Sequence, residues 1–175
     1  DEIDYKFRIT EELLVLDLEI NGRLDRVEVE KEYDDDLGVE FEEMKIRECA
    51  NKCVFCFVDQ NPPNMRDSMY FRDGDYRMSY LYGHYITLTN MGQNELNRIV
   101  TQRMSPLYIS VHVTDTQLRH RLFLYKRDDG LLEKLRFLTE NGIELHTQIV
   151  LMPNINDNKY LLGTLTDIYQ FYPKL

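Results

Sequence analysis

Cys49, Cys53 and Cys56 are the only cysteines of the 175-residue chain, and they follow one another with C-x3-C-x2-C spacing. Thiolates this close in sequence can converge on one inorganic centre, and iron–sulfur clusters are usually held by such runs. A cubane cluster has four irons, so three cysteines leave one iron open to an exogenous ligand. An open coordination position is what a catalytic metal site needs and what a structural site avoids.

Two other interpretations of the cysteines stay open from the residues alone. An odd number of thiols argues against a disulfide framework, but a tetrahedral zinc ion accepts three cysteines and one histidine. The fourth zinc ligand would then be His84, His112, His120 or His146. The last interpretation is three incidental core cysteines, although free cysteines in a core have no reason to cluster on one polar loop.

The chain is strongly acidic, with a formal net charge of −10 and a pI near 4.9. Duplex nucleic acid rewards lysine and arginine, so extended nucleic acid is an unlikely partner for a protein of this charge. One local stretch is basic and contains Arg119, His120, Arg121, Lys126 and Arg127. We interpret this stretch as a solvated helix end and loop, with a phosphate-bearing substrate as the alternative.

The composition is typical of a soluble globular protein, with 43% hydrophobic and 30% charged residues. No apolar run approaches the ~20 residues that a transmembrane helix needs. The sequence also shows no basic-then-apolar signal at its N-terminal end. We therefore expect a cytoplasmic protein without a membrane partner.

Residues 1–43 have the pattern of a β-hairpin. Apolar residues alternate over residues 14–20 with the period of two that is typical of a strand. The Asn21-Gly22 pair then predicts a tight turn, because both residues tolerate positive φ, and the alternation resumes at residues 27–29. A lone hairpin is only marginally stable, so we interpret residues 1–43 as the end of a small β-rich module and its linker.

From residue 44 the sequence changes to short strands that alternate with amphipathic helices. This alternation implies a parallel sheet with helices outside it, as an open α/β fold or as a barrel. The predicted strands cover residues 44–47, 85–89, 107–113 and 143–151. The predicted helices cover residues 93–103, 131–140 and 160–172. These units amount to about half of a full barrel.

The cysteine loop resembles the signature of the radical S-adenosylmethionine (SAM) superfamily, C-x3-C-x-aromatic-C, with Phe55 at the aromatic position. Further stretches resemble a bacterial family of unknown function that joins a PDZ-like domain to a radical SAM core and a C-terminal region. These stretches are residues 53–60, 73–82, 87–90 and 146–151. The resemblance runs along the whole chain.

The resemblance implies a truncated partial (β/α) barrel of radical SAM type over residues 44–175, preceded by a PDZ-like remnant at residues 1–43. It implies a [4Fe-4S] cluster on Cys49, Cys53 and Cys56 whose open iron chelates SAM. A donor such as ferredoxin or flavodoxin would reduce the cluster. SAM would then yield a 5′-deoxyadenosyl radical that abstracts hydrogen from a substrate which the sequence does not identify. The competing class is a non-catalytic scaffold, stabilised by zinc or an Fe–S cluster, whose PDZ-like part binds peptides.

The resemblance also implies residues that would surround SAM. Phe55 and Phe57 flank Cys56 and would pack against the adenine. Thr89 and Asn90 end the second predicted strand, where the superfamily usually has Gly-Gly-Glu. At this strand end the backbone carbonyls, or the two side chains, would contact the methionine part of SAM.

Later strands add further candidates. Ser110 and His112 lie two residues apart, so both face one side, where buried polar groups need a partner such as a cofactor. A core histidine bonded to backbone is the alternative for His112. Gln148 stands where superfamily members often place a polar SAM-contacting residue, and His146 shares its face. The polar, aromatic segment 59–84 is the candidate for a substrate-facing or partner-facing segment, because loops beyond barrel strands carry function.

Overall fold

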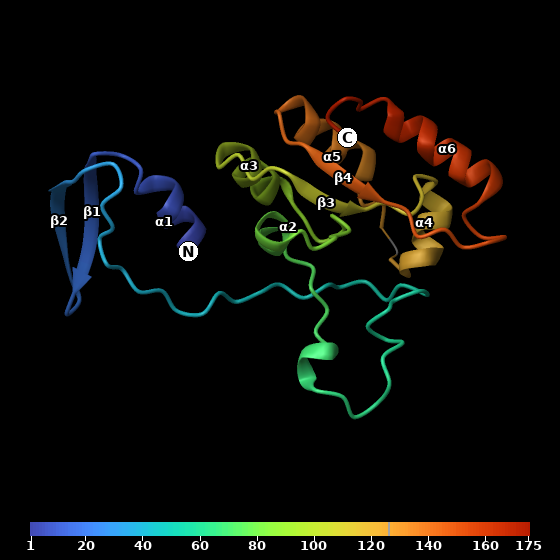
Figure 1. The fold of residues 1–175 in the computed structure, drawn as a ribbon, viewed down its shortest axis with the longest axis horizontal. Coiled ribbons are helices and arrows are strands. Elements are labelled where there is room, and N and C mark those ends of the chain that lie inside the picture. The colour runs from blue at the N-terminus through green and yellow to red at the C-terminus, as the bar shows by residue number, and fades with distance from the viewer. Residues whose placement is uncertain (126) are drawn as a thin grey trace. The chain divides into compact units, whose positions relative to one another are not determined.

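The computed structural model describes residues 1–125 and 127–175, so Lys126 of the basic stretch lies outside the described residues. The chain forms two compact units, Asp1–Lys45 and Ile46–Leu175. Each unit combines helix with short strands, which confirms the prediction of an α/β protein (Figure 1).

The first unit is a short helix followed by a hairpin. Helix α1, Glu2–Arg8, begins at Asp1, whose carboxylate accepts hydrogen bonds from backbone N–H groups of the first turn. Strand β1, Leu13–Ile20, pairs antiparallel with strand β2, Arg23–Glu30. The hairpin prediction is therefore confirmed, and α1 is additional to it.

The turn of the hairpin has the conformation that its two residues favour. Asn21 has a φ of 52° and Gly22 a φ of 78°, so both adopt the left-handed backbone of a tight two-residue turn. The strand register places Leu14 opposite Val29, which gathers the alternating apolar residues on one face. A hairpin of this kind does not identify the β-rich module to which it belongs, so the PDZ-like module stays a prediction.

The second unit is built on a short parallel sheet. Strand β3, Leu107–Ser110, pairs parallel with β4, Leu145–Gln148. On the other side of β3, Ile86 forms a single parallel bridge with Ile109. Three chain segments thus run in parallel in the order in which they occur in the sequence. Since the sheet is short and open, the partial barrel stays a prediction.

Two of the predicted strands are largely absent from the structure, and the predicted strands at residues 107–113 and 143–151 are shorter than predicted. Residues 44–47 form no strand, because the backbone N–H of Arg47 donates to the Asp75 carboxylate instead of to a neighbouring strand. Residues 85–89 are reduced to the single bridge at Ile86, because Leu88 has a φ of 59° and leaves the extended conformation. Both segments lie beside the cysteine loop, where local contacts override strand propensity.

The predicted helices are confirmed as α3, Gln93–Thr101, α5, Leu131–Glu140, and α6, Asn158–Tyr169. Helices α2, Tyr76–Tyr82, and α4, Thr116–Phe123, are additional to the prediction, as is a 3-10 turn at Asp67–Met69. Both extra helices begin at an aspartate that accepts a backbone N–H of the first turn. Their polar and aromatic sequences lack a clear apolar stripe, so the period alone does not predict them.

The core of the second unit lies between the sheet and its helices. Ile109 of β3, Ile99 of α3, and Leu135 and Leu138 of α5 are fully buried. Helices α3 and α5 pack against each other, and α2 packs against β3. Within the described residues, none of the helices combines the length and apolar character needed to cross a membrane.

Replacing Leu135 with alanine tests this core. We expect Leu135→Ala to lower the free energy of unfolding by about 2–5 kcal/mol, because it removes a buried side chain and leaves a cavity. The control is Leu162→Ala on α6, where the side chain is exposed and the loss should be under about 0.5 kcal/mol. Urea unfolding measures both values, and equal losses would contradict this assignment of the core.

Candidate functional site

The cysteine loop, residues 49–56, is attached to the C-terminal end of α4. The backbone N–H of Lys52 donates to the carbonyl of Phe123 at 3.2 Å, and that of Val54 donates to the carbonyl of Leu122 at 2.9 Å. The last carbonyls of a helix have no partner within the helix, so the loop satisfies them. Figure 1 shows α4 beyond the carboxyl ends of β3 and β4, which is therefore where the loop is held.

Asn51 closes a ring of hydrogen bonds between the cysteine loop and the segment that follows Ile86. Its Nδ2 donates to the Thr87 hydroxyl at 2.8 Å, and the Thr89 hydroxyl donates to Asn51 Oδ1 at 3.1 Å. The two hydroxyls are 2.8 Å apart, and Thr87 must be the donor because the Thr89 proton goes to Asn51. Asn51 and Thr89 are buried, so the ring satisfies polar groups that would otherwise be costly to bury.

A short antiparallel pairing holds Cys49 from another side. The Cys49 N–H donates to the Arg72 carbonyl at 2.7 Å, and the Gly74 N–H donates to the Arg47 carbonyl at 3.1 Å. The Arg72 guanidinium also donates to the Asn51 carbonyl at 3.0 Å. A Cβ at Gly74 would lie 2.7 Å from the Cα of Cys49, so this close approach requires glycine. The C-terminal part of segment 59–84 thus supports the cysteine loop.

The two aromatic residues that flank Cys56 lie in different surroundings. The Phe55 ring meets the His112 ring edge-on at 4.7 Å between centroids and lies 6.0 Å from the Phe123 ring. It also packs on a buried apolar cluster that consists of Val113, Leu118 and Leu122. Phe57 is 80% exposed. Packing therefore fixes Phe55 next to the cysteines and leaves Phe57 in solvent.

His112 is buried and has a left-handed backbone, with a φ of 60°. Its Nδ1 accepts a hydrogen bond from the Val150 N–H at 3.0 Å, which assigns the ring proton to Nε2. Burial, and then the charge of Arg119, lowers the pKa of His112 to about 4, so the ring is neutral at physiological pH. Within the described residues Nε2–H has no partner, so His112 is bonded to backbone on one side and offers a donor on the other.

Ser110 and Gln148 lie side by side in the register of β3 and β4. They alternate with the buried Ile109 and so share the opposite, polar face of the sheet. Neither side chain hydrogen-bonds to another described residue, which leaves a hydroxyl and an amide free at this face. His146 precedes Gln148 by two residues on β4, and its ring stacks on the Tyr108 ring at 4.9 Å between centroids.

The strand end that would face the methionine part of SAM is already hydrogen-bonded. The carbonyls of residues 87–90 each accept one side-chain donor, in order from Arg119, Lys134, Tyr125 and Arg47. The donor–acceptor distances run from 2.7 to 3.3 Å. A carbonyl oxygen has two lone pairs, so a ligand would have to use the second one. At Leu88 this second position is also taken, because its carbonyl accepts the Met91 N–H at 3.3 Å.

The basic stretch contributes a buried group, which corrects the prediction that it is solvated. Arg119 is 3% exposed and pairs with Asp129, whereas Arg121 and Arg127 are exposed. The sequence reasoning also missed Asn51 and Gly74. Asn51 could have been indicated by its position as a polar residue between two candidate ligands. Gly74 could have been indicated by its position as a glycine in a crowded polar segment.

The three thiols are free and half-buried. Burial raises the pKa of Cys49, and burial followed by the neighbouring Cys49 and Cys56 raises the pKa of Cys53 to about 12. Among the described residues, no three histidine, cysteine or acidic side chains are already arranged to hold a metal ion. The residues fit an iron–sulfur cluster in number, type and location, without a preformed ligand geometry.

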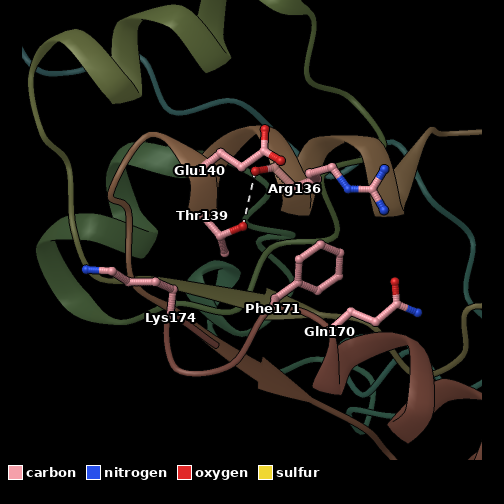
Figure 2. Close-up of a pocket in the computed structure, with 6 residues that line it drawn as sticks. All are labelled: Arg136, Thr139, Glu140, Gln170, Phe171 and Lys174. Carbon is pink, nitrogen blue, oxygen red and sulfur yellow. Dashed lines mark hydrogen bonds between the residues drawn. The ribbon is translucent and has the colours of Figure 1, made fainter.

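The hollow in Figure 2 lies away from these groups. It has a volume of about 240 Å³ and is lined by residues of α5 and of the chain that follows α6, among them Arg136, Phe171 and Lys174. None of the predicted site residues lines it. The candidate site is therefore the surface at the carboxyl ends of the strands, where Phe55 of the cysteine loop contacts His112 and where Ser110 and Gln148 end β3 and β4.

The second unit is thus a mixed α/β domain that carries a cysteine-bearing loop at the carboxyl ends of its parallel strands. The family model described as "Radical SAM-like domain" matches residues 31–175, which is most of the chain. The chain therefore belongs to the radical SAM-like domain family. No curated protein and no solved structure matches it significantly.

Removing one hydroxyl tests the ring around Asn51. Thr87→Val keeps the shape of the side chain but leaves the amide of Asn51 without its acceptor, so the free energy of unfolding should fall by about 1–3 kcal/mol. Urea unfolding measures the loss, with Thr101→Val at an exposed position of α3 as the control. Equal stability of Thr87→Val and the unchanged chain would show that the ring does not hold the loop.

The burial of His112 predicts a pH dependence of stability. The folded-state pKa near 4 lies below the unfolded value of 6.5, so the unfolded chain binds the proton first as the pH falls. Up to about 3 kcal/mol of stability should therefore be lost between pH 6.5 and pH 4, and no more below it.

The variant His112→Asn separates this effect from acid titration elsewhere. Asparagine tolerates a left-handed backbone and does not titrate, so the variant should lose less stability between pH 6.5 and pH 4. The comparison is made by urea unfolding across this pH range. The same slope in both proteins would contradict a neutral, buried His112.

Proposed function

We propose that this chain is the core of a radical SAM enzyme that holds a [4Fe-4S] cluster on Cys49, Cys53 and Cys56. The observation that carries the proposal is the attachment of the cysteine loop to the carboxyl ends of a parallel sheet through Asn51 and α4. Functional groups of α/β folds gather at this edge, because the ends of neighbouring strands converge there. Membership of the radical SAM-like family supports the same function independently.

The proposed reaction is the reductive cleavage of SAM. Three thiolates would hold the cluster and leave one iron for the amino and carboxylate groups of SAM. When bound, the cluster supplies the electron that divides SAM into methionine and a 5′-deoxyadenosyl radical for hydrogen abstraction. A one-electron donor such as ferredoxin or flavodoxin, and a substrate of unidentified chemistry, complete the proposed set of partners.

The chain's own side chains would bind and orient SAM. Phe55 offers a fixed aromatic ring beside the cysteines, and neutral His112 offers its Nε2–H. Ser110 and Gln148 offer a hydroxyl and an amide that no described residue uses. Thr89 contributes less directly, because its hydroxyl proton is committed to Asn51.

We further propose that the second unit is the start of a partial (β/α) barrel and that residues 1–43 are the end of a PDZ-like module. The parallel order of Ile86, β3 and β4 supports a barrel start. After α6 the chain returns alongside β4, where the Leu145 N–H donates to the Lys174 carbonyl at 2.8 Å.

The variant Cys56→Ala tests the assignment of the cysteines. After anaerobic reconstitution the unchanged chain should hold about four irons and four sulfides, and the variant should hold almost none, because two thiolates do not retain the cluster. Iron and sulfide analysis measures both, and isothermal titration with SAM should show binding only where the cluster is present.

The matched control is Lys52→Ala, which alters the same exposed loop without removing a thiol and should keep the cluster. Equal iron content in Cys56→Ala and in the unchanged chain would exclude Cys56 as a ligand. Stoichiometric zinc without sulfide in the unchanged chain would favour the competing class, a metal-stabilised scaffold that does no radical chemistry.

A further inference from the structure

Arg119 places a permanent positive charge where the ends of two parallel segments meet. Its Nη1 donates to the Val111 carbonyl at the end of β3, and its Nη2 donates to the Thr87 carbonyl at 3.0 Å. Its guanidinium carbon lies 4.4 Å from the centre of the Phe123 ring. One side chain of α4 therefore ties both strand ends to the helix that carries the cysteine loop.

This charge is buried together with its counter-ion. The side chains of Arg119 and Asp129 are 4% and 7% exposed, and the Arg119 Nε donates to Asp129 Oδ2 at 2.8 Å. Removing two charges from water costs several kcal/mol per ion, and replacing such a pair with apolar residues is often neutral or stabilising. A buried pair of this kind is therefore weakly explained by stability alone, and its position points to a second role.

The position of the pair is next to the cysteine loop. Phe123, whose ring Arg119 covers, accepts the Lys52 N–H through its carbonyl and packs against Phe55. One buried aromatic residue, Phe123, thus separates the Arg119 guanidinium from the loop, and in such an interior a charge acts more strongly than at the surface.

We propose that Arg119 and Asp129 set the reduction potential of the cluster that the cysteine loop holds. This inference rests on the proposed function and deepens it by naming the groups that tune electron entry. Each electron added to a thiolate-held cluster adds negative charge, and the potential of such clusters follows the charge around them. Arg119 stabilises the reduced form, and the Asp129 carboxylate partly offsets this effect.

The two members of the pair should therefore shift the potential in opposite directions. Asp129→Asn removes the offsetting charge and should raise the potential, and Arg119→Gln removes the cation and should lower it. We expect at least a tenfold change in the ratio of reduced to oxidised cluster for each, equal to 59 mV for one electron. A purely structural pair would not give opposite signs, because both variants break the same contact.

The experiment is a redox titration of the reconstituted 175-residue chain, followed by electron paramagnetic resonance. Arg119→Lys keeps the charge and should keep the potential near that of the unchanged chain. If Arg119→Gln does not fold, a raised potential in Asp129→Asn together with an unchanged potential in Arg119→Lys tests the inference. Asp128→Asn is the matched control, because it removes the neighbouring carboxylate, which binds the Gly130 N–H rather than Arg119, and should shift the potential less.

Opposite shifts for Asp129→Asn and Arg119→Gln support the inference. An unchanged or lowered potential in Asp129→Asn would overturn it while leaving the proposed function intact, because the cluster would still be present. A shift in Arg119→Lys as large as that expected for Arg119→Gln would also overturn it. An unchanged chain that takes up no [4Fe-4S] cluster would overturn the proposed function and this inference together.

Discussion

The hydrogen bonds that hold the cysteine loop against the strand ends are the interactions on which the candidate site depends. The loop has almost no secondary structure of its own, so its position must come from partners elsewhere in the chain. Asn51 supplies one anchor through the threonine hydroxyls, and the last carbonyls of α4 supply another. Each anchor pairs a group that would be costly to bury unsatisfied, which makes the loop position specific.

The same requirement explains the unusual backbone at the strand ends. Leu88 and His112 both have positive φ although neither is glycine, a conformation that costs on the order of 1–3 kcal/mol. At Leu88 the turn brings the hydroxyls on either side towards Asn51, and at His112 it directs the ring towards Phe55 and the Val150 N–H. The surrounding contacts therefore offset strain where the chain turns towards the cysteines.

Local patterns predicted much of the scaffold. The Asn21-Gly22 turn and the amphipathic period of α5 each depend on neighbouring residues, so the sequence alone was sufficient for them. Helix α4 was missed because its buried residues include the charged Arg119, whose partners are backbone carbonyls of segments far away in the sequence. The predicted strand at residues 85–89 was too long because its hydroxyls serve a loop 36–38 residues earlier.

The candidate site also has a part that could be predicted from neighbouring residues and a part that depends on contacts between distant segments. The spacing of the cysteines is local and was visible at once, together with Phe55 between two of them. The importance of Asn51, Gly74 and Arg119 depends on which segments meet in three dimensions, and no spacing in the sequence encodes that. The occupied carbonyls at residues 87–90 are another such case, because donors from four separate places in the chain reach them.

The most direct test of the account is electron paramagnetic resonance of the anaerobically reconstituted, reduced chain before and after SAM is added. The account predicts the signal of a reduced [4Fe-4S] cluster and a clear change in its g values with SAM, because SAM would occupy the iron that no cysteine holds. A cluster signal that SAM leaves unchanged, or stoichiometric zinc with no cluster signal, would contradict it.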